Sequence, residues 1–323
     1  MGLHVGIDTG GTFTDLIALD PAEGTLRALK TSSRPDEPGL AITAALSEGD
    51  ARGDEVERFT HGTTVGTNAL IERTGCRVGL LITAGFEDTP YIQRINRKVL
   101  YDLTWTKPQP LVGSRRLCLG VQERLGATGE VLQPVSEGQV RELCARLREH
   151  GAEAVAVCLL FSYVNTEHEQ RVKAIIQAEL GDLPVSVSHE VAPIWREYER
   201  ANTTVADAYL KPLLSRYVAS VDRELKSAGM ERGWTIMKSN GGAMLSHAAE
   251  APVQTVMSGP AGGMIATERV AAAEGIGDVL TLDMGGTSAD VGLLVGGEQK
   301  HTTEYEIEWG LPASVPIIDI KSI

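Results

Sequence analysis

The sequence has few cysteines, little positive charge and no long apolar run. Its four cysteines lack the paired spacing of a zinc site or a redox Cys-x-x-Cys, which indicates reduced, partly buried thiols: Cys76, Cys118, Cys144 and Cys158. The longest apolar stretches, such as Ala154 to Phe161, fall far short of the roughly 20 residues that a membrane span requires. Residues Met1 to Gly11 lack the basic segment of a secretory leader. We therefore expect a cytoplasmic protein without membrane association.

Positive charge is scarce enough to disfavour a nucleic-acid partner. Lysine and arginine contribute 30 side chains against 43 aspartates and glutamates, so the net charge is -13. A nucleic-acid-binding face needs clustered positive charge to displace counterions from phosphates. An anionic nucleotide must then be bound locally, through backbone amides and a metal ion. At 323 residues the chain can form two domains, since a domain usually holds about 100 to 200 residues.

Apolar periodicity in the first half predicts strands that alternate with helices. Leu3 to Ile7, Leu16 to Leu19 and Thr25 to Leu29 are separated by turn residues, which predicts a three-strand meander, and Pro38 to Leu46 has helical spacing. The next clear helix is predicted over Glu137 to His150, with Ser136 and Gln139 as a capping box.

A strand, helix and strand follow, and their order predicts a parallel sheet. The strand Ala154 to Leu160 is nearly all apolar, as expected of a strand buried on both faces, and it precedes a helix over Thr166 to Leu180 and a strand over Val185 to Ser188.

The second half predicts two helices within Glu197 to Ala228, separated by Pro212, and then a strand from Thr235 to Met237. Another helix is predicted to start after Pro260 and to run from Ala261 to Ala273, ahead of a strand from Val279 to Leu282. The apolar run Val315 to Ile323 breaks off without a turn or cap, so we expect the sequence to be truncated at this end.

One signature, Asp-x-Gly-Gly-Thr-x-x-Asp, occurs near both ends of the chain. It spans Asp8 to Asp15 and again Asp283 to Asp290, and each copy lies between two apolar segments. Two ordinary hairpin turns are the alternative, because Gly-Gly between strands is common. Chance hairpins have no reason to share the flanking aspartates and threonine, so the repetition favours a pair of phosphate-binding loops.

The residue types suit a nucleotide clamp that grips phosphates from two sides. Paired glycines let backbone amides approach anionic oxygens, and threonines add hydroxyls. A carboxylate beside a polyphosphate needs a magnesium ion between them, so Asp8 and Asp283 are candidate metal ligands and catalytic residues. The remaining candidates for nucleotide binding in the two loops are Thr9, Gly10, Gly11, Thr12, Thr14, Gly285, Gly286, Thr287 and Ser288.

With further stretches, these loops make the chain resemble the hydantoinase A and 5-oxoprolinase family. The supporting stretches run through most of the chain: His61 to Asn68, Ser188 to Pro193, Glu197 to Arg200, Lys238 to Gly242 and Ser258 to Gly263. The resemblance implies an α/β, actin-like, duplicated ribonuclease-H-type fold, in which two lobes have mixed sheets flanked by helices. We expect residues 1–190 to form a lobe with the first loop and residues 191–323 to begin the second.

The same resemblance implies an activity. ATP with Mg²⁺ would phosphorylate the carbonyl oxygen of a cyclic amide, of the hydantoin or 5-oxoproline type, for hydrolytic ring opening. In the acetone and acetophenone carboxylase relatives, ATP instead activates a ketone as its enol phosphate. Either reaction needs a second subunit, of hydantoinase B type, and we expect an oligomer. Family members continue past the present end into a Gly-rich stretch that holds the adenosine, and many have His where this chain has Lys321.

Two other kinds of function are possible for such a fold. The loops could report the nucleotide state of a non-catalytic switch, as in actins and heat-shock chaperones, or serve a kinase that phosphorylates a sugar hydroxyl. Substrate dependence separates these functions: a cyclic amide or ketone would stimulate ATP turnover in an enzyme subunit, whereas a protein client would stimulate it in a switch.

Further site candidates each have a structural alternative. His61 could reach a substrate carbonyl, or it could be a strand-end histidine bonded to backbone groups. Asn240 could face a phosphate, or it could form a left-handed turn. Gly259, Gly262 and Gly263 could bind phosphate at a helix N-terminus, with Ser258 as a turn residue. Two charged segments, Glu197 to Arg200 and Arg94 to Lys98, are candidates for an interface or an anionic ligand, or are solvated surface.

Overall fold

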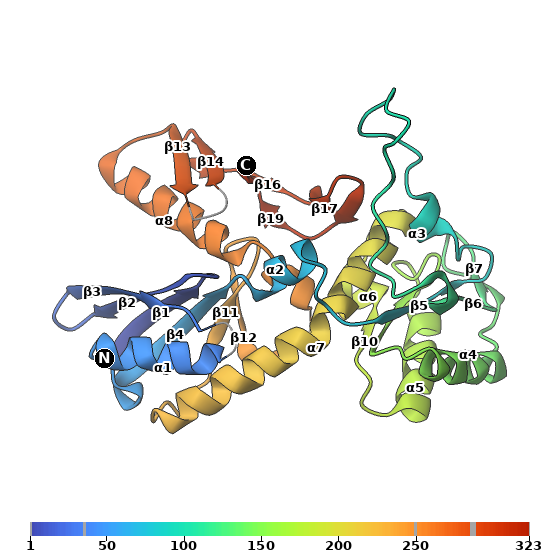
Figure 1. The fold of residues 1–323 in the computed structure, drawn as a ribbon, viewed down its shortest axis with the longest axis horizontal. Coiled ribbons are helices and arrows are strands. Elements are labelled where there is room, and N and C mark those ends of the chain that lie inside the picture. The colour runs from blue at the N-terminus through green and yellow to red at the C-terminus, as the bar shows by residue number, and fades with distance from the viewer. Residues whose placement is uncertain (1, 35–36, 249–250, 285–288, 323) are drawn as a thin grey trace.

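The computed structural model describes residues 2–34, 37–248, 251–284 and 289–322, which form three larger β-sheets with flanking helices. In Figure 1 the first sheet lies on the left, the second on the right, and helix α8 (Ser258–Glu274) with the third sheet lies above the first. No helix in these residues is long and apolar enough to cross a membrane.

The first sheet contains the predicted meander, which is confirmed. Strand β2 pairs antiparallel with both β1 and β3. Strand β4 pairs parallel with both β1 and β11. Burial alternates along β1, so one face of the sheet packs on the helices α1 (Pro38–Glu48) and α7 (Glu197–Ser227). The strand order is β12 (Ala243–Leu245), β11 (Thr235–Met237), β4 (Val56–Thr63), β1 (Leu3–Thr9), β2 (Phe13–Asp20) and β3 (Thr25–Ser32).

The second sheet is wholly parallel, as predicted for its β9 and β10 pair. Every residue of β5 and β9 is buried, because the helices α4 (Glu137–Glu149) and α5 (Glu167–Leu180) cover one face and α7 contacts the sheet as well. The strand order is β10 (Val185–Val187), β9 (Ala154–Cys158), β5 (Val78–Thr83) and β6 (Cys118–Val121).

Helix α7 connects these two cores, and here the sequence prediction was wrong. Two helices divided at Pro212 were expected, but α7 continues through Pro212 from Glu197 to Ser227. Proline cannot donate to the carbonyl of Ala208, four residues earlier, and the thiol of Cys76 takes that place at 3.4 Å. The Cys76 amide donates to the next carbonyl, of Tyr209, at 3.2 Å. The helix therefore tolerates its proline because another segment satisfies the freed carbonyl.

The third sheet repeats the first hairpin of the chain. Strand β13 (Val279–Met284) pairs antiparallel with β14 (Ala289–Val295), and Asp283 lies opposite Asp290 just as Asp8 lies opposite Asp15. Strands β15 (Glu298–Gln299) and β20 (Ile320–Ser322) flank β14, and α8 packs Ala261 and Met264 against this sheet. The duplicated fold expected from the sequence is thus visible in two hairpins of equal register.

Shorter elements complete the described chain. Three two-stranded ribbons are β7 (Arg124–Leu125) with β8 (Val131–Gln133), β16 (His301–Thr302) with β19 (Ile317–Ile318), and β17 (Tyr305–Glu308) with β18 (Leu311–Ala313). The short helices are α2 (Val65–Ile71), α3 (Thr89–Ile92) and α6 (Ser188–Val191), and single 3-10 turns span Gly53–Glu55, Arg115–Leu117, Ser246–Ala248 and Pro252–Thr255.

Two local predictions need correction. Ser136 does precede α4, but it makes no side-chain cap, because Gln139 instead accepts from the amide of Gln122 and donates to the carbonyl of Gly120. Helix α8 begins at Ser258, three residues before the predicted start, so Ser258 is its first residue rather than part of a turn.

Candidate functional site

The candidate site forms where three elements meet around Asp8. Asp8 is at the carboxyl end of β1, and Gly62 on the parallel strand β4 is its direct neighbour. A Cβ atom at Gly62 would lie 2.5 Å from the Asp8 Oδ1, and one at Gly259, in the first turn of α8, 3.4 Å from both carboxylate oxygens. The two glycines therefore leave the space that the Asp8 carboxylate occupies.

The pKa of Asp8 is affected by carboxylates of both signatures. Partial burial raises the pKa of Asp8, although the residue keeps solvent access, and the negative charges of Asp15 and Asp283 raise it further. Lys30 lowers the pKa of Asp8 but is itself paired with Asp15 at 2.6 Å. The effect of Asp283 places the end of β13 within electrostatic range of the end of β1. Gly285, Gly286, Thr287 and Ser288 lie outside the described residues.

The turn between β1 and β2 presents glycine backbone and the Thr12 side chain. Gly11 and Thr12 are exposed, and neither Gly10 nor Gly11 adopts a left-handed backbone conformation. A Cβ at Gly11 would meet nothing within 4 Å, so the space beside this residue is open.

Two hydroxyl candidates of the first loop point inward. The Thr14 side chain is fully buried and shares a hydrogen bond of 3.0 Å with Ser33. The Thr9 hydroxyl is buried too and has no partner of normal hydrogen-bond geometry among the described residues. Neither side chain is available to a bound nucleotide in this arrangement.

The start of α8 lies against this loop region with different roles for its glycines. The Ser258 hydroxyl donates to the carbonyl of Thr63 at 3.1 Å, which fixes the helix to the end of β4. Gly259 lies beside Asp8, whereas Gly262 packs against Met237 of β11, where a Cβ would lie 3.4 Å from the sulfur. Gly263 faces open space. Of the three glycines predicted here, only Gly259 is next to the Asp8 carboxylate.

His61 lies in the core, and its geometry favours the structural alternative. The ring is fully buried, Nδ1 donates to the carbonyl of Ile7 at 3.1 Å, and the Tyr217 hydroxyl donates to Nε2. Burial lowers the pKa of His61 to about 4 and raises that of Tyr217 to about 12, against the smaller lowering effect of the Thr63 and Thr9 hydroxyls. His61 therefore stays neutral, and its hydrogen bond to the Ile7 carbonyl supports β1 inside the core, away from any substrate.

Asn240 also adopts the structural alternative. Its side-chain oxygen accepts from the amide of Gly242 at 3.0 Å, which closes a tight turn between β11 and β12, and Gly241 has a φ of 78°. A Cβ at Gly241 would lie 2.7 Å from Ile265 of α8, so this turn positions α8 by packing.

The donors near Asp8 fit a magnesium ion that arrives with a nucleotide. The described residues contain no cluster of three histidine, cysteine or acidic side chains that could hold a metal alone. Magnesium bound with phosphates needs only one or two protein carboxylates. Burial is the main cause of the raised pKa of Asp8, and the charges of Asp15 and Asp283 add to it; a divalent cation would offset their repulsion of the Asp8 carboxylate.

A pocket near the start of α8 was not foreseen. It has a volume of about 440 Å³ and contains Met257, which directly precedes α8, together with Ile71, Tyr305, Ile307 and Ile317. Glu304, Glu306, Asp319 and Lys321 line its polar parts. No sequence pattern marked it, because its residues come from segments far apart in the chain.

Family models and a curated relative match this chain over nearly its whole length. The model of the hydantoinase/oxoprolinase N-terminal region matches residues 4–180, and that of hydantoinase/oxoprolinase matches residues 200–323. Caprolactamase subunit alpha of Pseudomonas jessenii is 36% identical over 99% of this chain and 47% of its own length.

Two solved structures share the fold over nearly the whole chain. The nucleotide-free structure of acetone carboxylase matches with a TM-score of 0.90 and 27% identity, over 100% of this chain and 48% of its own. The ATP-dependent caprolactamase of Pseudomonas jessenii matches with a TM-score of 0.88 and 36% identity, over 99% and 48%. The chain spans about half the length of the curated relatives it matches. By these matches and the duplicated actin-like hairpins, the chain belongs to the hydantoinase/oxoprolinase family.

Proposed function

We propose that this chain is the ATP-using part of an enzyme that phosphorylates the carbonyl oxygen of a cyclic amide and so activates it for hydrolytic ring opening. The observation that carries the proposal is the Asp8 carboxylate, which lies between Gly62 and Gly259 and within electrostatic range of Asp283 on the duplicated hairpin. Phosphoryl transfer requires mainly positioning and charge neutralisation, which backbone amides and a magnesium ion held by two carboxylates would provide.

Each part of the site has a task in this proposal. The amides of Gly11 and Thr12 and the first turn of α8 would contact the phosphates, because the loop directly follows Asp8 and the α8 turn contains Gly259 beside its carboxylate. The Gly10 amide donates to the Phe13 carbonyl at 3.0 Å and would hold the turn. Asp8 and Asp283 would hold Mg²⁺, which neutralises charge on the phosphates when bound. The buried pair of His61 and Tyr217 would keep the end of β1 in place.

The pocket beside Met257 is a suitable place for the cyclic amide. Its apolar side chains could surround a small ring, and its position directly before α8 puts it next to the turn that contacts Asp8. A cyclic amide is preferred over a ketone because the caprolactamase relative is 36% identical, against 33% for the acetophenone carboxylase gamma subunit and 27% for the acetone carboxylase structure. A carboxylase subunit, which would activate a ketone, remains the second candidate, favoured by the slightly higher TM-score of 0.90.

A second subunit is part of the proposal, because the caprolactamase relative is itself named as a subunit. The segment between α3 and β6 projects from the top of Figure 1 and exposes large apolar side chains that a partner of hydantoinase B type would cover. Those side chains are Ile95, Val99, Leu100, Tyr101 and Leu103, of which Tyr101 and Leu103 are each 91% exposed. The oligomeric state, the cytoplasmic location and the division at residue 190 stay predictions.

The test is the ATPase activity of Asp8→Ala in the complete complex with its partner subunit. We expect ATP hydrolysis stimulated by a lactam, hydantoin or oxoproline in the wild type and near-complete loss in Asp8→Ala, because the metal and phosphates lose a carboxylate. Asp182→Asn, an exposed acidic residue on the second-sheet side, is the matched control and should keep full activity. Full activity in Asp8→Ala would refute the assignment, and stimulation by a protein client alone would favour a nucleotide switch.

A further inference from the structure

A second pocket, unrelated to Asp8, lies at the carboxyl end of the second sheet. Its volume is about 390 Å³, and it forms between the segment that follows β9 and the start of α7. Ligands of parallel sheets bind at this end of the strands, where loops meet. The pocket is lined by Arg94, Leu160, Phe161, Tyr163, Trp195, Arg196, Glu197 and Arg200, and shares no residue with the site around Asp8.

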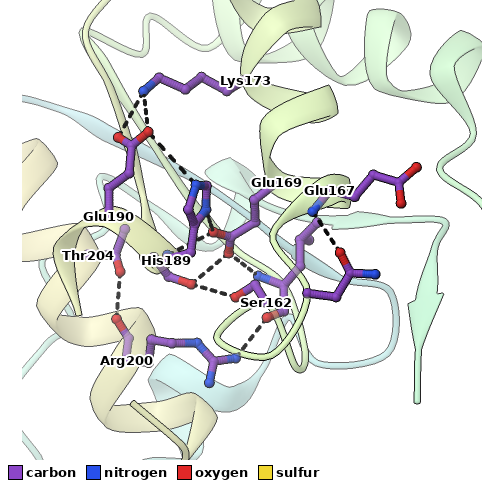
Figure 2. Close-up of polar contacts among 11 residues, drawn as sticks. Ser162, Glu167, Glu169, Lys173, His189, Glu190, Arg200 and Thr204 are labelled. Atoms are coloured by element: carbon purple, nitrogen blue, oxygen red, sulfur yellow. Dashed lines mark hydrogen bonds and ion pairs between the residues drawn. The ribbon is translucent and has the colours of Figure 1, made fainter. Parts of the chain in front are cut away.

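Buried polar contacts hold the wall of this pocket in place (Figure 2). The Arg200 guanidinium donates through Nη1 to the carbonyl of Ile194 at 2.9 Å and through Nη2 to that of Leu159 at 2.8 Å. Glu169 in turn accepts from the Leu159 amide at 2.8 Å and from the Ser188 hydroxyl at 2.6 Å. Arg200 is only 1% exposed, and its Nε has no hydrogen-bond partner among the described residues. The backbone contacts and the Tyr163 ring thus hold a buried positive charge in the wall of the pocket.

Of the other two arginines that line the pocket, only Arg94 is paired with an acidic side chain of the described chain. Glu199 binds Arg94 through two hydrogen bonds, one of them 2.7 Å long, and so neutralises it. The Arg196 guanidinium lies 4.5 Å from the centre of the Trp195 ring and forms no ion pair within the described chain. Glu197 is the single carboxylate that lines the pocket. Arg196 and Arg200 thus lie at the pocket without an ion-pair partner in the described chain, although Arg200 donates to two backbone carbonyls and its guanidinium lies 5.1 Å from the centre of the Tyr163 ring.

The backbone at the pocket is held in an unusual conformation at two positions. Phe161 has a φ of 58° and Arg196 a φ of 75°, in the left-handed region that residues with a Cβ rarely adopt. Such conformations persist where the surrounding contacts enforce them, and they gather at ligand sites. Both residues belong to the pocket lining, one on each side.

We propose that this pocket binds a small carboxylate with a flat apolar body, with Arg196 as the donor to the carboxylate, the buried charge of Arg200 as electrostatic support and the aromatic side chains as walls. Arginine donors match the two oxygens of a carboxylate, and aromatic rings accept a flat apolar group. Glu197 disfavours a dianion such as phosphate more strongly than it disfavours a monoanion. This inference does not depend on the proposed function, since it rests on residues of the second sheet and of α7 alone.

The experiment is equilibrium dialysis of the full chain against radiolabelled benzoate, with benzamide and inorganic phosphate as competitors. We expect saturable binding of benzoate that neither competitor displaces, because benzamide lacks the charge and phosphate lacks the flat body. Arg196→Gln should weaken binding about tenfold or more, the effect of losing a charged hydrogen bond. Glu197→Gln should strengthen it several-fold, because it removes the only carboxylate in the lining.

Controls separate this pocket from the rest of the molecule. Arg223→Gln replaces an exposed arginine near the other end of the same helix and should leave benzoate binding unchanged. The proposal would be overturned if Arg196→Gln bound benzoate as tightly as the wild type or if Arg223→Gln lost binding. It would also be overturned if phosphate displaced benzoate or if benzoate did not bind saturably. Loss of binding in Asp8→Ala would also overturn it, by assigning the bound benzoate to the nucleotide site.

Discussion

At the scale of single residues, the Asp8 carboxylate depends on a glycine of the neighbouring strand. A Cβ at Gly62 would lie 2.5 Å from the Asp8 Oδ1, a distance that requires the carboxylate to move. The flexible end of an aspartate can move while the strands stay paired, so the change should affect position more than stability.

Gly62→Ala should therefore reduce ATP turnover by about a hundredfold, the loss that a displacement of roughly 1 Å can cause, while the circular dichroism spectrum stays that of the wild type. Gly138→Ala, in helix α4 with no atom near the added methyl group, is the control and should keep activity. If Gly62→Ala turns over ATP at the normal rate, the position of Asp8 does not limit catalysis.

His61 makes a prediction about stability and pH. Its pKa is lowered to about 4 by burial, whereas the unfolded chain takes up the proton near the ordinary value of 6.5. Stability from neutral His61 is fully present above pH 6.5 and is lost as the pH falls through 4, in total about 3 kcal/mol.

Urea denaturation at pH 7.5 and pH 5 measures this effect. We expect the difference in unfolding free energy between the two pH values to be about 2 kcal/mol smaller in His61→Gln than in the wild type, because glutamine does not titrate. An equal pH dependence in both proteins would show that His61 is accessible and protonated in the folded state.

The sequence predicted where Asp8 lies in the fold, but not how the side chains around it are arranged. A duplicated Asp-x-Gly-Gly-Thr pattern identifies residues at a strand end, and β1 and β13 do end there. It does not say which side chains turn inward. Thr14 and His61 are buried because alternate residues of β2 and β4 face α1 and α7, and Tyr217, the partner of His61, is 156 residues away along the chain.

At the scale of elements, helix α7 shows how a distant segment can override a local signal. Pro212 is a helix breaker in isolation, yet Cys76 satisfies the carbonyl of Ala208 from a segment 132 residues earlier. Apolar periodicity is local, and it predicted the helices α1, α4, α5 and α8 and several strands, whereas the short helices α2, α3 and α6 and strands such as β4 and β5 were not predicted. A contact between Cys76 and α7 leaves no such pattern.

Replacement of Cys76 tests this contact. Cys76→Ala should lower the free energy of unfolding by about 1 kcal/mol, because a helix carbonyl loses its donor, and Cys76→Ser should recover part of that loss through its hydroxyl. Urea titrations of both variants give the comparison. A serine variant no more stable than the alanine variant would mean that the thiol acts by packing alone.

At the scale of the whole molecule, α7 ties two cores together. Leu210 belongs to the core of the second sheet, and Leu214, one turn later, belongs to that of the first. The same helix thus fixes the second sheet relative to the Asp8 loop, while α8 connects that loop to the repeated hairpin through Gly259 and Met264. The relative position of Asp8 and Asp283 is a property of this assembly, which no single motif could specify.

The joint action of the two hairpins can be measured as a thermal shift with Mg²⁺ and a non-hydrolysable ATP analogue. Without ligand, Asp283→Asn should slightly stabilise the chain, because it removes one of the charges that raise the pKa of Asp8.

With ligand, Asp8→Asn and Asp283→Asn should each lose the increase in melting temperature that the wild type shows, since binding stabilises the folded state in proportion to affinity. The double variant should behave like either single one if both carboxylates hold one ion. A wild-type shift in Asp283→Asn would leave Asp8 as the sole carboxylate of the site, and the second hairpin would then have no part in holding the metal.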